Sequence, residues 1–342
     1  MRNKLLLFFI LGFSYSCTEE EKIKDNSPPV AQFTVQDDLD KFRLDASLST
    51  DADHDPLIYS WSASTDKVAI KTIDITSSYF KIPDASQEET VNITLKVRDR
   101  SQESVLTQSV NVPALTEVRS FGLGRDLVRE TSNNRPYEWY SDQGFTGTFS
   151  TVNCGPAVAT MAIAWSIQDF PGTPQDARNT YRSGGGWWYT DDIINYLNKY
   201  NVNNWTIPLD EMQSLKDEID KGNIAILCLD MFHVAALNPE MDSEYRKNKF
   251  YATAAAGWGH FVVVKGYKEV DGIIYFEVYD SYSFGNQYTD LTPKGKNRYY
   301  TANDLDHATQ VWWDFAIVVS KNAFSGGRRA VNNNEIEHKP GQ

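Results

Sequence analysis

The sequence predicts a chain of more than one domain, in which a small antiparallel β-sandwich precedes an α+β domain. Its length of 342 residues exceeds what one hydrophobic core usually organises. Short segments of alternating apolar and polar residues recur between residues 30 and 112, the period of half-buried strands. From residue 143 onward, helical patterns come first and apolar strand patterns follow, which is typical of an α+β domain.

Composition and charge exclude some partners. A formal net charge of −13 argues against nucleic acid, because phosphate binding needs a concentrated Lys and Arg surface. The acidity bears mainly on solubility. No cluster of His, Cys and carboxylate residues has the spacing of metal ligands, so no metal or organic cofactor is expected.

The first 16 residues have the pattern of a secretory signal peptide. A basic start precedes the apolar run from Leu5 to Phe13, which is far shorter than the roughly 20 residues that span a bilayer. Cys17 follows, and this junction resembles the lipobox of bacterial lipoproteins, which implies that Cys17 is lipidated. The resemblance predicts a protein of the bacterial cell envelope, held by lipid at the outer membrane or cell surface, with residues 17–28 as a tether.

Residues 29–113 are expected to form the β-sandwich. The clearest alternation is in a strand that places Val91, Ile93, Leu95 and Val97 on one face, and it is less strict at Val105, Val110 and Val112. The segment LDASLSTDADHDPLIYSW, Leu44 to Trp61, resembles the signature of polycystic kidney disease (PKD) repeats. These are immunoglobulin-like sandwiches that act as spacers or adhesive modules, so the resemblance implies a cell-surface or extracellular ligand for this domain.

Three aspartates within that segment suggest calcium, but the spacing favours an Asp-rich turn. A calcium loop of the EF-hand type that starts at Asp51 would need Gly and Glu at the positions of Pro56 and Ser62. Aspartate side chains commonly accept hydrogen bonds from the backbone of turns. Asp51, Asp53 and Asp55 are therefore expected to shape a turn.

Residues 114–136 are expected to connect the domains, residues 137–322 to form the second domain, and residues 323–342 to be a flexible tail. Four helices are predicted: Ala157 to Trp165, one that opens at Thr173-Pro174, Thr190 to Tyr200, and one that starts with an Asp210/Gln213 capping box and ends at Gly222. Four apolar strands follow: NIAILCLDM, HFVVVKGY, IIYFEVYD and WWDFAIVVS.

Cys154 is the candidate nucleophile. It stands directly before Gly155-Pro156 and a small, apolar stretch, the pattern of a buried helix with proline in its first turn. A thiol at a helix N-terminus meets unpaired backbone N–H groups and the positive end of the helix dipole, and both favour the nucleophilic thiolate. Two other interpretations stay open: a disulfide with Cys228, which an extracytoplasmic compartment permits, and an inert buried thiol.

His260 is the candidate base, since it heads an apolar strand after two glycines. The other histidines are expected in a turn of the first domain (His54), after a strand (His233), in a polar connector (His307) and in the tail (His338). Its strand and the strand that ends at Asp280 flank Asp271-Gly272, a hairpin signal. Depending on loop length, His260 faces a residue between Asp280 and Ser283, so Asp280 is placed to orient the imidazole. The alternatives are a core histidine satisfied by a backbone carbonyl and an aspartate that only ends a strand.

These residues carry a family resemblance. The blocks NCGPAVATM, GHFVVVKGY and YDSY, in this order, resemble papain-like cysteine peptidases of the bacteriocin-leader-processing type and their double-glycine-peptidase-like relatives, across roughly residues 137–322. The resemblance implies a papain-like fold with an antiparallel sheet, Cys154 as nucleophile, His260 as general base and then acid, and Asp280 as the orienting residue.

The same resemblance implies an upstream glutamine that donates to the oxyanion beside the Cys154 backbone N–H, and Gln143 is the only nearby candidate. Gln143 lies eleven residues before the cysteine, farther than papain-like enzymes commonly place it, so either an insertion is looped out or another donor serves. Leader-processing peptidases are joined to membrane transporters. This sequence has no transmembrane pattern, so double-glycine leader specificity is not transferred.

Other residues near these blocks have plainer roles. Cys228 lies in the middle of a strand and is expected to be structural. The pairs Trp187-Trp188 and Trp312-Trp313 either line a substrate groove or, more commonly for such residues, belong to the aromatic core. Trp258, two residues before His260, is expected to shield the site.

The sequence thus predicts a lipid-anchored cysteine peptidase that cleaves a peptide or protein amide through an acyl-enzyme. A cell-wall amidase or a transglutaminase-like acyl transferase would use the same chemistry. From another class, the chain could be a catalytically silent binding or adhesion lipoprotein. The membrane, through the lipid on Cys17, and a peptide substrate are the expected partners, and nucleic acid is not.

Overall fold

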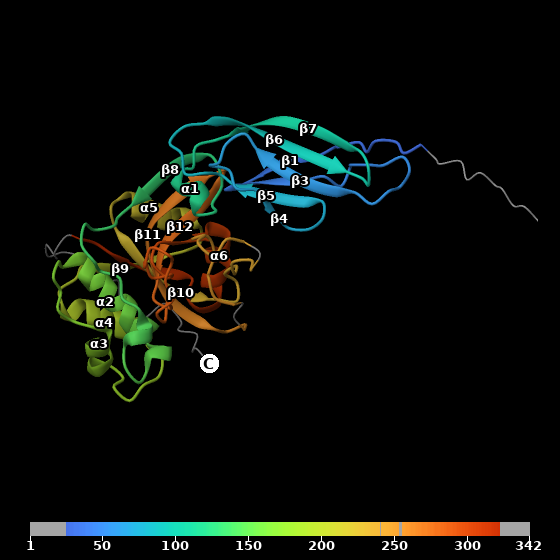
Figure 1. The fold of residues 1–342 in the computed structure, drawn as a ribbon. Coiled ribbons are helices and arrows are strands. Elements are labelled where there is room, and N and C mark those ends of the chain that lie inside the picture. Colours follow the sequence, from blue (N-terminus) through green and yellow to red (C-terminus); the bar gives the residue numbers. More distant parts are fainter. Residues whose placement is uncertain (1–24, 240, 253–254, 322–342) are drawn as a thin grey trace, which may run out of the picture. The chain divides into compact units, whose positions relative to one another are not determined.

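The computed structural model describes residues 25–239, 241–252 and 255–321 (Figure 1). The signal peptide, Cys17 and the expected tail lie outside the described residues. Two compact units are present: one comprises residues 25–36, 43–80 and 90–111, and the other comprises residues 37–42, 81–89 and 112–321. No helix among the described residues is long and apolar enough to cross a membrane.

The N-terminal part of the chain forms two sheets. A four-stranded sheet has the order β1-β2-β5-β4, and a three-stranded sheet has the order β3-β6-β7. Their bounds are β1 Thr34–Asp38, β2 Lys41–Asp45, β3 Ile58–Ala63, β4 Lys71–Thr72, β5 Ser77–Lys81, β6 Glu89–Arg98 and β7 Glu103–Val112.

Alternation in the sequence predicted the buried face of β6 correctly. Val91, Ile93, Leu95 and Val97 are all buried. On β7 the pattern changes along the strand, because Val105 is half exposed whereas Val110 and Val112 are buried. The Asp-rich segment forms a turn, in which Oδ1 of Asp51 accepts hydrogen bonds from the backbone N–H groups of Asp53 (2.8 Å) and Asp55 (3.0 Å).

The second unit is built on an antiparallel sheet of seven strands, in which six follow the order β13-β12-β11-β10-β14-β9 and β8 pairs with β11. The strands are β8 Leu127–Ser132, β9 Asn204–Pro208, β10 Ile224–Asp230, β11 Gly259–Val270, β12 Ile273–Asp280, β13 Arg298–Thr301 and β14 Phe315–Val319. The helices are α1 Glu117–Ser120, α2 Cys154–Ser166, α3 Pro174–Thr180, α4 Thr190–Lys199, α5 Met212–Asp220 and α6 Ala302–Trp312.

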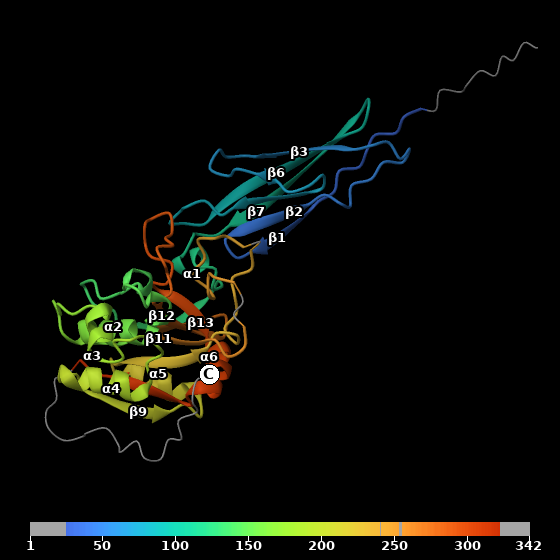
Figure 2. The ribbon, with the colours of Figure 1, turned by 90° about the horizontal axis from the view of Figure 1, so that it is seen from below.

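Helices cover both faces of this sheet. On β10, Ile224, Ile226 and Cys228 belong to the cluster that contains α2 and α4, and the alternate residues belong to the cluster that contains α5 and α6. In Figures 1 and 2, α2, α3 and α4 accordingly gather on one side of the strands. A strand whose two faces are both buried has no polar alternation, and all seven residues of β10 are buried.

Three parts of the second unit differ from the sequence-based expectation. The segment expected to be a connector contains α1 and β8, and β8 pairs with the second half of β11 although its side chains are mostly exposed. His307 lies in α6, not in a polar connector. Glu211, not Asp210, is the N-cap residue of α5, and no side-chain capping bond forms there. The side-chain amide of Gln213 donates to Asp217 within the helix.

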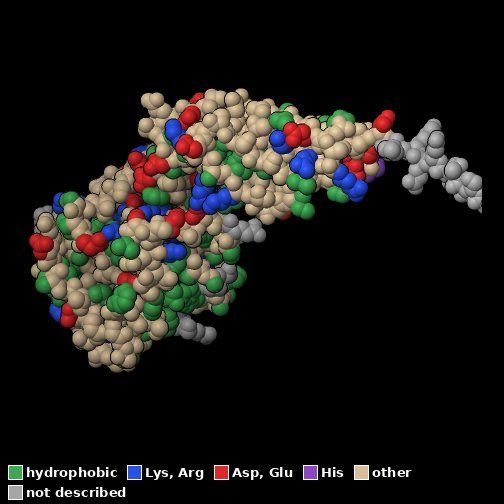
Figure 3. All heavy atoms as spheres, viewed as in Figure 1, with side chains coloured by type: hydrophobic (Ala, Val, Ile, Leu, Met, Phe, Trp, Pro, Cys, Tyr) green, Lys and Arg blue, Asp and Glu red, His purple; other side chains and the backbone are tan. Residues whose placement is uncertain are grey.

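On the face of the molecule shown in Figure 3, Lys and Arg side chains are interspersed with Asp and Glu side chains.

Candidate functional site

Cys154 is the first residue of α2, which begins three residues before the helix predicted at Ala157 and so includes the Gly-Pro signal. Eleven of the thirteen residues of this helix are buried, and Cys154 is 2% exposed. The thiol therefore lies where the first backbone N–H groups of a buried helix and the positive end of its dipole stabilise an anion. Cys154 and Cys228 are both free, so the disulfide considered from the sequence is not formed in this structure.

Gly155 allows α2 to approach the chain around Trp188. A Cβ atom added at Gly155 would lie 2.6 Å from Cβ of Trp188, closer than real Cβ atoms come, and 3.2 Å from its Cγ. Trp188 is itself buried, and its Nε1–H donates to the carbonyl of Tyr181, so it has little freedom to move. Packing thus requires glycine beside Cys154.

We expect Gly155→Ala to lower the free energy of unfolding by about 1–3 kcal/mol, the usual cost of overpacking a well-packed core. This cost outweighs the gain of up to about 1 kcal/mol that Ala gives in a helix interior. Urea unfolding followed by Trp fluorescence measures the change. Gly184→Ala is the matched control, because a Cβ there meets nothing within 4 Å, and equal stability of the two variants would contradict the packing role.

His260 and Asp280 form a direct hydrogen bond between neighbouring strands. Asp280 pairs with Val262 in the β11–β12 ladder. The same register continued by two residues places His260 opposite position 282, which lies within the expected interval from Asp280 to Ser283. Nε2 of His260 lies 2.7 Å from Oδ1 of Asp280. The two side chains are 2% and 0% exposed.

The imidazole also interacts with Cys154, whose side chain is among the groups that raise the pKa of His260. Because Nε2 faces Asp280, Nδ1 is the ring nitrogen left for the sulfur. The structure thus brings together the three residues that the sequence selected, in the order thiol, imidazole, carboxylate.

Charge interactions overcome burial at this pair. Burial alone lowers the pKa of His260, but the charge and hydrogen bond of Asp280, with a smaller effect of Cys154, raise the pKa to about 10. Burial alone raises the pKa of Asp280, but His260, Tyr300 and the Tyr282 backbone N–H lower the pKa to about 2. An imidazolium and a carboxylate therefore coexist across the neutral range.

Both oxygens of Asp280 are saturated by donors. Oδ1 accepts from His260 and from the backbone N–H of Tyr282 (2.9 Å), and Oδ2 accepts from the hydroxyls of Tyr251 (2.9 Å) and Tyr300 (2.7 Å). Burial raises the pKa of both phenols well above the ordinary value, so they remain protonated donors. No sequence signal pointed to Tyr251 or Tyr300, which come from a loop and from β13.

Gln143 is anchored next to this pair. Its backbone N–H donates to the carbonyl of Ser281 (2.8 Å), and its side-chain Oε1 accepts from the Ser281 hydroxyl (2.8 Å). One N–H of its amide donates to the carbonyl of Ser150 at 3.0 Å, and an amide nitrogen carries a second N–H. The extra residues between Gln143 and Cys154 contain two short 3₁₀ turns, Gln143–Phe145 and Ser150–Val152.

Aromatic rings line one side of the imidazole. Trp258 lies nearly parallel to His260, with ring centroids 6.2 Å apart, and Tyr282 contacts the two rings edge-on at 5.1 and 6.0 Å. Tyr282 in turn contacts the exposed Phe284. Trp258 is thus in position to shield the site, as expected, and Tyr282 extends this wall.

The paired tryptophans mostly serve the core. Trp188 belongs to the buried cluster around α2, and Trp312 and Trp313 pack against it. Trp187 is 37% exposed. Cys228 is buried on β10, where burial, with smaller effects of the Cys154 and Asp230 charges, raises the pKa of its thiol well above the ordinary value. Cys228 is therefore a poor nucleophile compared with Cys154.

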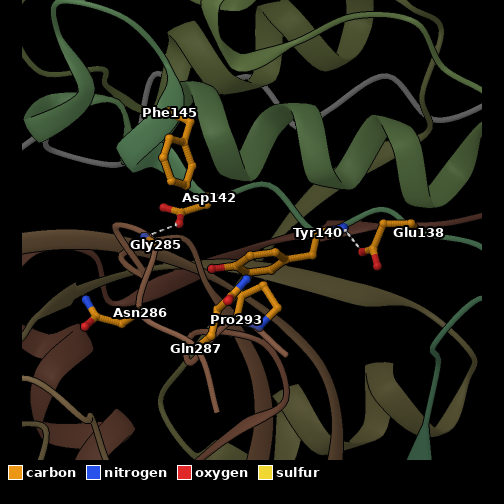
Figure 4. Close-up of a pocket in the computed structure, with 8 residues that line it drawn as sticks. All are labelled: Glu138, Tyr140, Asp142, Phe145, Gly285, Asn286, Gln287 and Pro293. Carbon is orange, nitrogen blue, oxygen red and sulfur yellow. Dashed lines mark hydrogen bonds between the residues drawn. The ribbon is translucent and has the colours of Figure 1, made fainter. Parts of the chain in front are cut away.

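A pocket of about 610 Å³ lies beside this site but does not include Cys154 or His260 (Figure 4). It is lined by Glu138, Tyr140, Asp142, Phe145, Gly285, Asn286, Gln287 and Pro293. Tyr140 connects it to the site, because its hydroxyl donates to the backbone carbonyl of Asp280 at 2.9 Å. Asp142 precedes Gln143 and accepts from the backbone N–H groups of Phe284 and Gly285 (both 2.9 Å).

In the part of the chain that the structure describes, no group of three or more His, Cys, Asp or Glu residues is placed to hold a metal ion.

No protein family model matches the chain. No curated protein matches it either. Three solved structures show limited similarity. A nucleoside hydrolase-related hypothetical protein from Saccharophagus degradans, associated with carbohydrate metabolism, is 27% identical over 26% of this chain and 26% of its own, with a TM-score of 0.22. This chain thus spans about a quarter of that protein's length.

The other two structures are peptidases. A C39-like peptidase from Bacillus anthracis is 12% identical, covering 57% of this chain and 99% of its own, with a TM-score of 0.37. Digestive procathepsin L 3 of the Tenebrio molitor larval midgut is 14% identical, covering 57% of this chain and 71% of its own, with a TM-score of 0.36. Structural neighbours of this chain therefore include peptidases, and likenesses this weak carry no functional inference.

Proposed function

We propose that the chain is a papain-like cysteine peptidase that hydrolyses an amide bond through a Cys154–His260–Asp280 triad. The observation that carries the proposal is the buried cluster of Cys154, His260 and Asp280, in which His260 is hydrogen-bonded to Asp280 and interacts with Cys154 at the start of α2. A helix N-terminus and an imidazolium are two of the surroundings that make a cysteine nucleophilic. With a free, buried thiol so placed, nucleophilic catalysis is the chemistry that fits best.

In this mechanism the thiolate of Cys154 attacks the carbonyl carbon of the substrate, and the C=O π electrons move onto oxygen. The oxyanion accepts hydrogen bonds from the backbone N–H of Cys154 and from the second amide N–H of Gln143. Imidazolium His260 then gives its proton to the amine as the C–N bond breaks, which leaves a thioester. Neutral His260 then takes a proton from water as the hydroxide adds to the thioester carbonyl. The C–S bond breaks, the carboxylic acid departs, and the Cys154 thiolate and the His260 imidazolium are restored.

The surroundings favour a peptide as substrate. The aromatic wall of Trp258, Tyr282 and Phe284 excludes water from one side of the imidazole and offers apolar contact area for side chains. We place the enzyme in the bacterial cell envelope, anchored through Cys17, with the N-terminal PKD-like domain as a spacer or adhesive module. A peptide or protein outside the cytoplasm is then the expected substrate.

We expect Cys154→Ala to abolish cleavage of a degenerate peptide library by the full chain, as read by mass spectrometry. Cys228→Ala is the matched control, because it removes the other buried thiol and leaves the triad intact, and it should cleave at the unsubstituted rate. Cleavage by Cys154→Ala at the unsubstituted rate would contradict the proposal.

Adding an amine acceptor to the assay distinguishes hydrolysis from acyl transfer, which use the same thioester chemistry. Products that carry the acceptor would indicate acyl transfer instead of hydrolysis. If the unsubstituted chain cleaves nothing and Cys154 is not alkylated by iodoacetamide below pH 8, the domain is catalytically silent and the proposal is wrong.

A further inference from the structure

Arg178 is a fully buried cation whose side chain ends beside the nucleophile. It lies on α3 and is 0% exposed. Its Nε–H donates to Oδ1 of Asn153 at 2.7 Å, and its Nη2 donates to the carbonyl of Val152 at 2.9 Å. The third nitrogen, Nη1, donates to the carbonyl of Arg182 at 3.2 Å. Val152 and Asn153 are the two residues before Cys154, so the guanidinium is bonded to the segment that carries the thiol.

Within the described residues, Arg178 forms no ion pair with a carboxylate. Asp192 on α4 is the nearby acid, but it is bonded to the guanidinium of Arg182 at 2.6 Å. Burying a cation without a counter-charge is costly, so a buried arginine normally has an anion close by. Apart from Asp192, the group near Arg178 that can become an anion is the Cys154 thiol.

Electrostatics agrees with this geometry. Burial lowers the pKa of Arg178. The charges of Cys154 and, more weakly, of Asp192 raise this pKa, and the charge of Arg182 lowers it further. The titratable groups whose pKa values are affected by Cys154 are those of Arg178 on α3, His260 on β11 and Cys228 on β10. Burial keeps the Cys228 thiol protonated, so His260 and Arg178 are the two cations among them.

We propose that Arg178 is a positioning residue that stabilises the thiolate of Cys154 with a second buried positive charge and fixes the Val152-Asn153 turn. The inference rests on the proposed role of Cys154 as a nucleophile. Asn153 is held from both sides, because its Nδ2 donates to the carbonyl (3.1 Å) and hydroxyl (2.9 Å) of Thr146 while its Oδ1 accepts from Arg178. The N-cap residue of α2 is thereby tied to α3.

The test is the pH dependence of iodoacetamide alkylation at Cys154, followed by peptide mapping of the full chain so that other thiols do not contribute. We expect Arg178→Met to raise the midpoint pH of alkylation by about one unit, the effect of losing a nearby opposite charge. Arg178→Lys should recover part of this shift, since it keeps the charge but loses the planar fork.

Arg135→Met is the matched control. Arg135 is a partly buried guanidinium that stacks on Trp165 and donates to the Trp165 carbonyl near the other end of α2. Its loss should affect stability without moving the alkylation midpoint. An unchanged midpoint in folded Arg178→Met, or an equal shift in Arg135→Met, would overturn the inference.

A second measurement needs no substitution of Arg178. In the His260→Ala variant, Arg178 and the helix dipole remain, and we expect a midpoint still below the pH of about 8.5 at which a free cysteine ionises. A midpoint at or above that value would overturn the inference even if Arg178→Met does not fold. A similarly high midpoint in the unsubstituted chain would instead refute the proposed peptidase function, because Cys154 would then not be activated at all.

Discussion

The Asp280→Ala variant is expected to lose about 3–5 kcal/mol of unfolding free energy and at least about 10²-fold in hydrolytic rate. Removing the carboxylate leaves four donors without this acceptor, namely the imidazole of His260, the backbone N–H of Tyr282 and the hydroxyls of Tyr251 and Tyr300. The imidazolium also loses the anion that raises its pKa. Urea unfolding and the rate of library cleavage measure the two effects separately.

Tyr300→Phe is the graded control for this experiment. It removes one hydroxyl and keeps the ring, so Asp280 loses a single donor, and we expect a cost of about 1.5–3 kcal/mol, the value of a hydrogen bond to a charged group. The remaining donors still hold the carboxylate beside His260, so most of the rate should remain. If Asp280→Ala is no less stable than Tyr300→Phe, the carboxylate does not have the network role described above.

Local signals in the sequence predicted the elements that carry the chemistry. Gly155-Pro156 predicted the helix start at Cys154, and Asp271-Gly272 predicted the hairpin that places Asp280 near His260. These signals act over a few residues, because a helix start and a two-residue hairpin loop are determined by neighbouring backbone conformations. The hairpin signal alone allowed several pairing registers between the two strands. The observed register is set by the complete β11–β12 ladder, which contains an irregularity between Val264 and Gly266.

Contacts between distant segments could not be predicted in this way. Tyr300 lies on β13 and Tyr251 in a loop, and they meet Asp280 only after the sheet has assembled. Arg178 is a single basic residue in a short helix, and nothing in its neighbours marks it as buried. Strand β8 escaped detection because its exposed side chains show no apolar alternation and its pairing with β11 depends on backbone bonds.

The stabilising effect of the His260–Asp280 pair is expected to be greatest between about pH 4 and 6.5. The pKa of Asp280 is lowered to about 2, so its contribution is complete above its unfolded pKa of about 3.9 and is lost as the pH falls toward 2. The pKa of His260 is raised to about 10, so its contribution is complete below about 6.5 and is lost as the pH rises toward 10. On each side of this maximum, the stabilisation changes by up to about 1.4 kcal/mol per pH unit.

A difference measurement isolates the pair from all other titrating groups. The unfolding free energy of the unsubstituted chain minus that of a His260→Gln/Asp280→Asn variant should be largest near pH 5.5 and smaller at pH 3 and 9.5. The double variant preserves neutral hydrogen-bonding groups at both positions, so it removes charge without emptying the site. A difference that stays constant across this range would mean that the two groups titrate normally. Cys154 would then lack a charged imidazolium beside it across the neutral range, and the contribution of His260 to an activated thiolate would be lost.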